Sequence, residues 1–502
     1  MTPLLALLAP VSPEPLGAAH RHQVTLLAWA GVVIALGLFA WLGLRFSRIE
    51  SRGDFLLMGR GVGFWLFFGA YTGASIGGAS LAGFTGEGYV SGISATWLIV
   101  VSSITVPLFA WMFGPAINRF GREHGAATLG DFLAWRYGPA IRGPAMVLTY
   151  LRPAFITGLQ FLAIGTLMRA AFGTGTATGV LLGAGVVLAY SALGGQYSAI
   201  TSQWLQALLQ GLGMFVFLGL AVSVHGGLGA AGEALTRDLP ASFRDVWSIS
   251  PGVLSVWVIS MGLFYFVDPW LYQWAYMARD QRTSRNALVV ASVTSPWTAV
   301  SFLGGMLLAA GVRTGRLRIP DGLDPDLVYL HFVQDHVGTV LAAFLLVSFL
   351  ATVLSCASSF LMNGATILQA DLLEPLLARR ARVGPVTLGR IAVLLTGLLG
   401  IAAALWVPVL VPLWIIGQTI AVSGLFWPVL AAWVWPRASG TAAVASLLVG
   451  SGTSFAWAMA AWFARGSANA TWHGLHAAHV GMGLSLVVLV AVSLTTGRKE
   501  AR

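Results

Sequence analysis

Apolar stretches of about twenty residues recur along almost the whole chain, and this feature limits the possible folds more than any other. A helix of about twenty residues is about 30 Å long, which matches the hydrocarbon core of a bilayer. Only 9% of the 502 residues are charged and 57% are hydrophobic, which leaves too little polar surface for a water-soluble chain. We therefore expect an all-α polytopic membrane protein that lies in a lipid bilayer and has no separate soluble domain.

The polar breaks between these stretches predict about thirteen membrane-spanning helices. The expected spans are 24–46, 61–86, 93–114, 143–170, 177–192, 198–223, 252–276, 287–312, 336–372, 386–406, 409–434, 440–463 and 475–496. This gives an external N-terminal tail (1–23), an extra N-terminal helix (24–46), a ten-helix core (47–434), two C-terminal helices (435–496) and a cytoplasmic tail (497–502).

The basic residues predict the orientation of the chain in the membrane. The net charge is +10, but 19 of the 28 lysines and arginines fall in alternate loops and in the C-terminal tail. Loops rich in Lys and Arg face the cytoplasm. We therefore expect the N-terminus outside and the C-terminus inside a cell (inner) membrane, and we read the charge as a topology signal, with no nucleic-acid partner.

Two spans carry residues that interrupt a helix. The second span reads FGAYTGASIGGASLAGFTGEGYVSG, with adjacent Gly77 and Gly78 near its middle. Such small residues either allow close helix packing or mark a broken helix whose backbone lines a cavity. Five spans later, Pro269 interrupts FYFVDPWLYQW. Breaks five helices apart are typical of transporters built as an inverted repeat.

Several segments, taken in order, resemble the sodium:solute symporter family, which includes bacterial sodium–proline and sodium–glucose symporters. The segments are SRGDFLLMGRGVGFW, TLGDFLAWRYG, YSALGGQYSAITSQWLQALLQ, ATVLSCASSFLMNGATILQADLLEP and PVLAAWVWPRASGTAAVASLLVG, which extend over about residues 45–450. The resemblance implies a leucine-transporter-like five-plus-five inverted repeat with flanking helices. It also implies alternating access and sodium as the coupling ion.

The resemblance implies a sodium site between the first break and the eighth core helix. It assigns the ligands to the carbonyls of Gly73, Ile76 and Thr352 and the hydroxyl of Ser355, followed by Cys356 where the family usually has a second hydroxyl. A thiol is a poor ligand for a hard cation. The Thr352 hydroxyl, at a position where the family usually has alanine, is a possible replacement. The alternative is that these hydroxyls bond only to their own helix.

Two further positions depart from the family pattern. Gln203 stands where sodium-coupled members usually carry an Asp on the inner path of the ion, and Ser75 stands where some members carry Asn or Asp. Proton coupling or weak coupling therefore stays open as an alternative to sodium coupling.

Arg152 is a charged residue near the middle of a span. It follows Gly143 by nine residues, or roughly 14 Å of helix. A charge at this depth needs a partner or a cavity, and Arg binds carboxylates through a bidentate fork. One hypothesis is that Arg152 binds the carboxylate of the solute. The alternatives are pairing inside the bundle, or a shift caused by Pro153 that carries the side chain to the cytoplasmic face.

The remaining candidate contacts are polar or aromatic residues near the two breaks. The predicted solute-binding set is Ser75, Gly77, Ser80, Arg152, Gln160, Phe264 and Tyr265, with Tyr197 and Trp274 as weaker cavity aromatics. Asp268 either caps the helix after the break, coordinates a cation or pairs with Arg279. Glu87 is expected to be wet.

His473, His476 and His479 form an H-x-x-H-x-x-H pattern. On a helix the three rings would share about a third of the circumference, so a transition-metal site is conceivable. We favour wet histidines at the membrane interface, because no Cys or carboxylate adjoins them.

The sequence lacks the phosphate-binding loop of ATP-driven pumps and the HExxH motif of zinc proteases. The expected function is sodium-coupled symport of a small organic solute, with a carboxylate favoured by Arg152, and no organic cofactor. A membrane sensor derived from the same fold is the main rival, and an integral membrane enzyme is a weaker one.

Overall fold

The structure is a computed structural model that describes residues 11–377, 383–406 and 410–500. It is all-helical, with short 3-10 and π turns between or within the helices. The helices are α2 (Gly17–Arg45), α3 (Arg52–Leu57), α4 (Phe64–Ser75), α5 (Phe84–Ser91), α6 (Trp97–Met112), α7 (Gly114–His124), α8 (Leu129–Tyr137), α9 (Arg142–Phe172), α10 (Thr176–Ser223), α11 (Leu228–Arg237), α12 (Ala241–Arg244), α13 (Pro251–Trp257), α14 (Pro269–Met277), α15 (Gln281–Thr294), α16 (Ala299–Arg313), α17 (Val328–His336), α18 (Thr339–Ile367), α19 (Glu374–Leu377), α20 (Pro385–Trp406), α21 (Leu410–Val434), α22 (Gly440–Arg465) and α23 (Ala477–Glu500).

Ten segments of the described chain are helical, apolar and at least 18 residues long, as membrane spans require. One of them, α10, has 48 residues. A straight helix of this length would measure about 72 Å, more than twice the hydrocarbon core. The predicted count of thirteen spans stays a prediction, because it depends on how such long and interrupted segments are divided.

A sharp bend at Gly195 divides α10. Gly195 has φ +52° and ψ −141°, outside the helical region. The Ser198 hydroxyl donates to the Tyr190 carbonyl oxygen at 2.8 Å, whereas residues eight apart in a straight helix are about 12 Å apart. A side chain at position 195 would collide with Phe55, because an added Cβ would lie 2.6 Å from the Phe55 carbonyl oxygen. The bend lies between the predicted spans 177–192 and 198–223.

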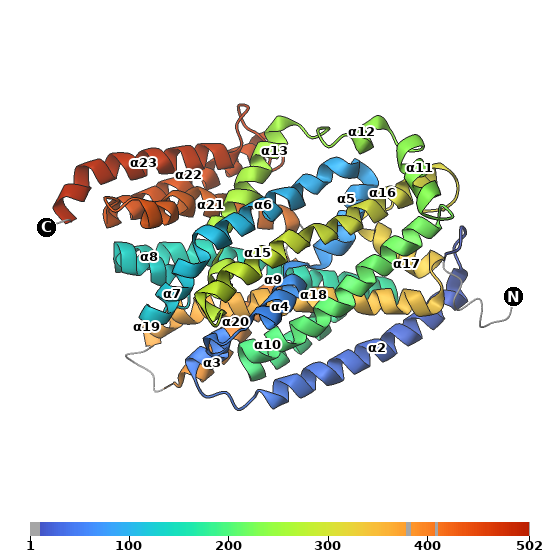
Figure 1. Cartoon of the computed structure of the whole chain (residues 1–502), viewed down its shortest axis with the longest axis horizontal. Coiled ribbons are helices and arrows are strands. Elements are labelled where there is room, and N and C mark those ends of the chain that lie inside the picture. Colours follow the sequence, from blue (N-terminus) through green and yellow to red (C-terminus); the bar gives the residue numbers. More distant parts are fainter. Residues whose placement is uncertain (1–10, 378–382, 407–409, 501–502) are drawn as a thin grey trace.

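The long helices run roughly along the long axis of the molecule, and the start of α2 and the end of α23 lie at opposite ends (Figure 1). The arginine-rich segments around α3, α7 and α8 gather at the end where α23 finishes. α11, α12 and α17 lie at the other end. An odd number of membrane crossings would place the two ends of the chain on opposite sides of the membrane. The positive-inside rule would then place the arginine-rich end in the cytoplasm. α2 begins at Gly17, inside the segment that we read as an external tail.

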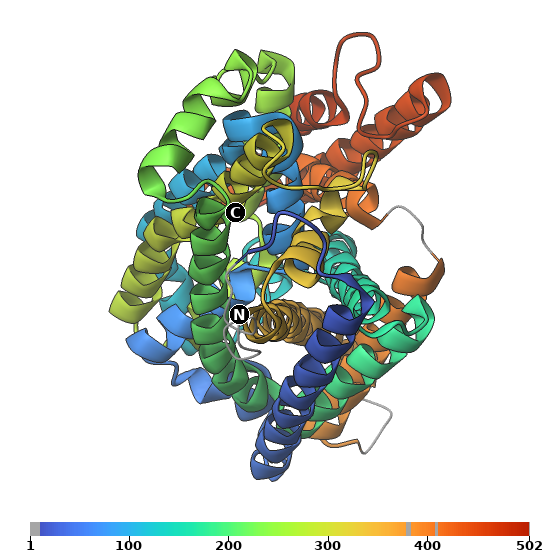
Figure 2. The ribbon, with the colours of Figure 1, turned by 90° about the vertical axis from the view of Figure 1, so that its right-hand side faces the viewer.

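α18 forms the centre of the bundle, and nearly all of its residues are buried. Seen along the long axis, it is surrounded by the other helices (Figure 2). Close packing depends on glycine: an added Cβ at Gly73 of α4 would lie 2.7 Å from the Gln203 carbonyl oxygen of α10. α5 and α16 approach as closely, since a Cβ at Gly88 would lie 2.1 Å from the Phe302 carbonyl oxygen. Small residues bring the helices that carry the site into direct backbone contact.

Candidate functional site

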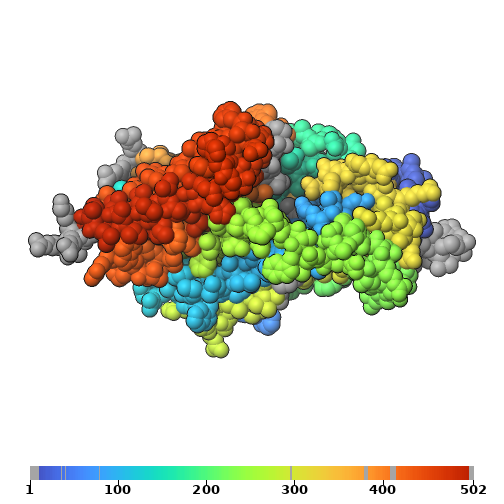
Figure 3. All heavy atoms as spheres, turned by 90° about the horizontal axis from the view of Figure 1, so that it is seen from above, coloured from blue at the N-terminus to red at the C-terminus, as the bar shows by residue number. Residues whose placement is uncertain are grey.

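A cavity of about 980 Å³ lies at the centre of the bundle. Its lining begins at the first helix break and reaches the loops around Asp326 and His476, at the end of the molecule that carries α11 and α12. Seen from above (Figure 3), red α22 and α23 cover one end of the molecule, and the green and yellow segments cover the other. Among the lining residues of the described chain, Arg152 is the one Lys or Arg.

The first break lies between α4 and α5 and confirms the broken-helix interpretation. α4 ends at Ser75, Ile76 is extended with φ −106° and ψ 121°, and helical structure resumes at Ala79. Gln160 of α9 holds the freed backbone, because its Oε1 accepts a hydrogen bond of 3.0 Å from the Gly78 amide. An added Cβ at Gly77 would lie 2.8 Å from Gln160 Nε2 and 3.0 Å from Cys356 Sγ. A larger residue here would have to displace the side chain of Gln160 or Cys356.

The second break precedes α14. The chain leaves the helical path at Val267 and Asp268, and Pro269 occupies the first helical position, where its missing N–H costs nothing. Asp268 Oδ1 accepts a 3.0 Å hydrogen bond from the Trp270 amide. Asp268 is therefore the N-cap of α14, as one of the sequence interpretations held. It does not pair with Arg279, which instead lies 3.1 Å from Asp280.

Arg152 and Asp268 form a buried ion pair between α9 and the second break. Arg152 Nη1 donates to Asp268 Oδ2, and the two side chains are 7% and 0% exposed. The guanidinium lies between the rings of Phe264 and Phe360, 5.2 and 4.9 Å from their centroids. Arg152 Nε is buried and has no partner among the described residues. The arginine thus lines the cavity with donor capacity to spare, and the snorkelling alternative is wrong.

The predicted sodium ligands come together beside the first break. Gly73 and Ile76 lie on α4 and at its end, and Thr352, Ser355 and Cys356 lie on the part of α18 that faces them; all five are buried. The Thr352 hydroxyl donates to the Ser348 carbonyl oxygen at 2.9 Å, so its proton bonds back to the helix. The Ser355 hydroxyl has no partner among the described residues. An orphaned hydroxyl beside a helix break fits a hard cation.

Gln203 lies on α10 behind these residues. Its Nε2 is 3.3 Å from the Ser358 hydroxyl and 3.5 Å from the Ser355 carbonyl oxygen. The Ser358 hydroxyl itself donates back to the Ser355 carbonyl at 3.0 Å, as the alternative interpretation of the serines held. The neutral amide therefore occupies the back of the predicted sodium site.

The predicted solute contacts divide into two groups. Six line the cavity: Ser75, Gly77, Ser80, Arg152, Gln160 and Tyr265. The prediction for Phe264 is wrong, because its ring is 1% exposed and packs against Arg152 instead of the cavity. Trp274 is buried away from the cavity and packs on Phe67. Tyr197 contacts Asp54, 3.3 Å away, outside the cavity.

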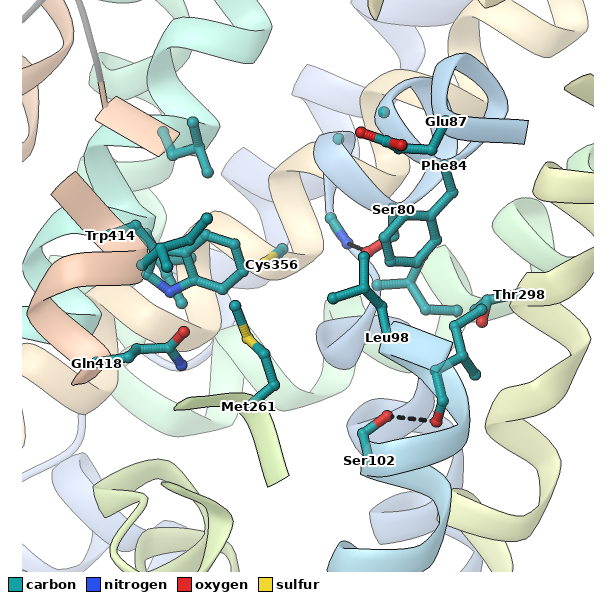
Figure 4. A pocket seen from close by; sticks show the side chains of 18 of the residues that line it. Ser80, Phe84, Glu87, Leu98, Ser102, Met261, Thr298, Cys356, Trp414 and Gln418 are labelled. Carbon is teal, nitrogen blue, oxygen red and sulfur yellow. Dashed lines mark hydrogen bonds between the residues drawn. The ribbon is translucent and has the colours of Figure 1, made fainter. Parts of the chain in front are cut away.

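Sequence reasoning missed residues from α6 and α21 that line the cavity. Figure 4 shows Trp414 and Gln418 of α21 on one side, facing Leu98 of α6 on the other, with Cys356 between them. Trp414 Nε1 and Gln418 Oε1 are buried and without partners among the described residues. Donors and acceptors left open at a cavity wall are available to a polar solute. The sequence did offer one signal for this part of the cavity, because Gln418 is a lone polar amide in the long apolar span 409–434.

The three histidines do not share a helix, so that part of the prediction is wrong. α23 begins only at Ala477, and His473 lies in the preceding loop with φ +48°. His476 is 1% exposed instead of wet. Burial, followed by the nearby His479, lowers the pKa of His476 to about 4. The described residues contain no group of three or more His, Cys, Asp or Glu side chains that could hold a metal ion.

At the opposite end of the bundle, charged groups on α8, α9 and the turn after α18 form a cluster. Arg142 pairs with Asp131 and lies 3.8 Å from Asp371. The Thr128 hydroxyl donates to Asp371 Oδ1 at 3.0 Å. None of these residues lines the central cavity, whose lining reaches the loops at the other end of the molecule.

Comparisons with known proteins agree with this architecture. Residues 55–450 match the profile of the Sodium:solute symporter family. The osmoregulated proline transporter OpuE of Bacillus subtilis is 25% identical, over 93% of both chains. The sodium/proline symporter of Salmonella typhimurium is 26% identical, over 88% of both chains.

Solved structures share the fold. A Na⁺-coupled sialic acid symporter in a substrate-bound outward-open state superposes with a TM-score of 0.79 at 14% identity, over 93% of this chain and 98% of that one. The nucleobase–cation symporter Mhp1 in a closed conformation gives a TM-score of 0.52 at 13% identity, over 88% and 94% of the two chains. These likenesses support the predicted leucine-transporter-like fold.

Two broken helices, a central cavity and a family match over most of the chain thus agree. The protein is a multi-pass membrane transporter and not an enzyme. The chain belongs to the sodium:solute symporter family.

Proposed function

We propose that this protein carries a small organic solute with a carboxylate into the cytoplasm, together with sodium, by alternating access. The observation that carries the proposal is the position of Arg152, which lines a cavity at the first helix break and pairs with Asp268 at the second. Breaks of this kind offer free backbone groups to ions and solutes, and movement of one repeat against the other changes access to the site.

The solute proposal rests on the chemistry of the cavity. Arg152 is a cation with unused donors, and Gln160, Gln418 and Trp414 add neutral polar groups. A carboxylate fits the arginine fork, and the apolar walls suit a compact ring or aliphatic body. The similarity of this chain to sodium/proline symporters makes L-proline the first solute to test.

The solute must share Arg152 with Asp268, which holds it by one Nη1 contact. A solute carboxylate that bonds to the remaining N–H groups competes with Asp268 for the same charge. Since Asp268 is also the N-cap of α14, any shift of its carboxylate acts directly on the second break. We propose that this link transmits solute binding to the moving helices.

Sodium, as the coupling cargo, would bind between the carbonyls of Gly73, Ile76 and Thr352 and the hydroxyl of Ser355. Its support is the buried, unpartnered Ser355 hydroxyl beside the first break. With the basic end of the molecule in the cytoplasm, the cavity opens outward, so sodium and solute enter together from outside. For coupling, the cation must bind more tightly to this outward-open form than to the inward-open one.

The test is thermal stability of the purified protein in detergent, in sodium chloride against choline chloride at equal ionic strength and pH. A ligand that binds only the folded state raises the melting temperature, because it adds RT ln(1 + [L]/Kd) to the free energy of unfolding. We expect sodium to raise it, Ser355→Ala to abolish the rise, and L-proline to add a further rise only with sodium. Sodium-dependent uptake of labelled L-proline into proteoliposomes checks transport directly. A flat response to sodium over a wide concentration range contradicts sodium coupling.

Proton coupling is the second candidate, and two residues favour it. Cys356 and Gln203 replace a hydroxyl and an acidic side chain that the resemblance associates with sodium, and both lie beside the site. In this case, uptake into proteoliposomes follows an imposed pH gradient in the absence of sodium.

A further inference from the structure

Three glutamines of α10 form a polar face inside the bundle, defined here as the glutamine face: Gln203, Gln206 and Gln210. At 100° per residue, their side chains lie within about 60° of one another around the helix. They are 1%, 2% and 0% exposed. Neutral amides this deep in a membrane protein are costly unless they have hydrogen-bond partners, so their surroundings need an explanation.

The amides of the glutamine face are mostly without partners. Gln203 Oε1, Gln210 Oε1 and both polar atoms of Gln206 contact no donor or acceptor among the described residues. Gln210 Nε2 lies 3.5 Å from the Ile76 carbonyl oxygen, which is long for a hydrogen bond. The amide group of Gln210, held by one long contact, is free to turn about its last side-chain bond.

The register of α10 against α18 places the glutamine face beside the predicted sodium ligands. Gln203 Nε2 lies 3.5 Å from the Ser355 carbonyl oxygen, and the Ser348 hydroxyl donates to the Leu209 carbonyl oxygen at 3.0 Å. The two helices are therefore antiparallel neighbours here, and the segment of α18 opposite Gln206 includes Thr352. At its far end the face reaches Ile76, at the first break. The unpartnered hydroxyl of Ser355 borders the same space.

We propose that the glutamine face is a third wall of the cation site, and that the amide oxygen of Gln210 is a ligand of the bound ion. This inference rests on the proposed sodium coupling. Turning the amide about its last bond exchanges Nε2 for Oε1 and leaves the rest of the side chain in place. Hard cations such as calcium bind oxygens at about 2.3–2.6 Å, and two such ligands at right angles are about 3.5 Å apart. The spacing between Gln210 and the Ile76 carbonyl already has this value.

The amide oxygen of Gln210 also offsets the hydroxyl that this chain lacks. Cys356 offers the site a soft sulfur where a second hard oxygen would bind sodium better. An amide oxygen is a hard ligand of the kind that cations of this type accept from Asn and Gln. Without the ion, the same side chain donates to Ile76, so the site keeps one of its carbonyls satisfied in both states.

The experiment measures the half-saturating sodium concentration, obtained by fitting how the free energy of unfolding rises with sodium concentration, for the purified full-length protein and three variants. Gln210→Met keeps length and apolar volume but removes the amide. Gln210→Glu keeps an oxygen in place and adds a charge. Gln334→Met is the matched control, because Gln334 Nε2 also donates to a main-chain carbonyl, that of Ala170 at 2.9 Å, far from the site.

We expect Gln210→Met to raise the half-saturating sodium concentration by about tenfold or more, the loss typical when a group that supports a bound metal is removed. Gln210→Glu lowers it at pH 8, and Gln334→Met leaves it unchanged. A Gln210→Met protein that responds to sodium like the wild type overturns the ligand role while sodium coupling stands. If Gln210→Met does not fold, a Gln210→Glu protein with unchanged sodium dependence overturns it equally. A wild type without any sodium response overturns the proposed coupling, and the ligand role with it.

Discussion

The guanidinium of Arg152 and the carboxylate of Asp268 depend on each other, because each would otherwise be a charge without a counter-ion inside the bundle. Removing one partner of a buried pair destabilises a protein by about 3–5 kcal/mol. A role in solute binding adds a second effect, which a purely structural pair does not have. The two effects are separable with matched variants.

Arg152→Gln is expected to lower the affinity for the carboxylate solute by at least about tenfold, since a hydrogen bond to a charged group contributes about 1.5–3 kcal/mol. The double variant Arg152→Gln with Asp268→Asn removes both charges and keeps the acceptor that caps α14. The double variant should recover the melting temperature that Arg152→Gln alone loses. It should not recover the affinity for the solute. Unchanged affinity in both variants contradicts the solute role of Arg152. Solute-dependent melting curves and uptake measure the two quantities.

Cys356 offers a gain-of-function test at the sodium site. Cys356→Ser places a hydroxyl oxygen where a thiol now lies, next to Ser355 on α18. We expect sodium to bind about tenfold more tightly, equivalent to about 1.4 kcal/mol. Cys356→Ala is the control, since it removes the thiol without adding an oxygen. Equal sodium affinity in the serine and alanine variants would show that position 356 does not contact the ion.

The pKa of His476 predicts an acid-sensitive loop at the mouth of the cavity. Burial holds this pKa near 4 in the folded protein, against an ordinary value of 6.5. Between these values the unfolded state binds more protons, so stability falls as the pH drops from about 6.5 to about 4, by up to about 3 kcal/mol. Replacing His476 with Asn should flatten the pH dependence of the melting temperature over this range. His473→Gln, at an exposed position, should leave it as in the wild type.

The sequence predicted the position of single residues where the family resemblance fixed their order along the chain. It did not predict positions that depend on tertiary contacts. Gly77, Ser80 and Gln160 were placed correctly at the cavity because they lie at or opposite a visible helix break. The pairing of Arg152 with Asp268 joins positions 116 residues apart, and no local pattern encodes it. Phe264 and Tyr265 are neighbours of the same chemical type, and only the turn before the second break decides which of them faces the cavity.

At the scale of helices, the contact between α4 and α10 positions the first break. A methyl group at position 73 would lie 2.7 Å from the Gln203 carbonyl oxygen and 2.9 Å from Ala207 Cβ. We expect Gly73→Ala to destabilise the protein by about 1–3 kcal/mol, as overpacking does, and to weaken sodium binding by moving the Ile76 carbonyl. Gly185→Ala on α10 points into open space and should be neutral or slightly stabilising. Melting temperatures with and without sodium compare the two variants.

The sequence predicted helix interruptions better than helix starts. Gly-Gly in one span and Asp-Pro in another have direct backbone consequences, and both breaks are present. The histidine pattern failed because apolar periodicity does not define a helix start, and a loop with a left-handed residue at His473 precedes α23. The helix α10 contains two of the predicted spans, and they are separated only by the backbone conformation of Gly195.

At the scale of the molecule, the cavity lining reaches one end, and Arg142, Asp131 and Asp371 form a cluster at the other, which the proposed alternating access takes as the closed end. Cys356 is the one cysteine of the chain and lines that cavity, so it reports on access without any engineered site. We expect a small charged thiol reagent added from outside to label it, and sodium with L-proline to slow the labelling. Arg142→Gln weakens the closed end and should also slow external labelling. Labelling that neither ligand nor variant changes contradicts alternating access at this site.

The buried pair also sets the electrical behaviour of the carrier. Arg152 and Asp268 together carry no net charge, so under the proposed alternating access the pair contributes no net charge to the empty site. A monocarboxylate with one sodium ion leaves that sum at zero, whereas a zwitterion such as proline with one sodium ion raises it to plus one. A charge that moves through the membrane field is driven by about 2.3 kcal/mol per 100 mV. Whether a solute generates current in this protein therefore follows from the number of charges it adds to a site that is already balanced.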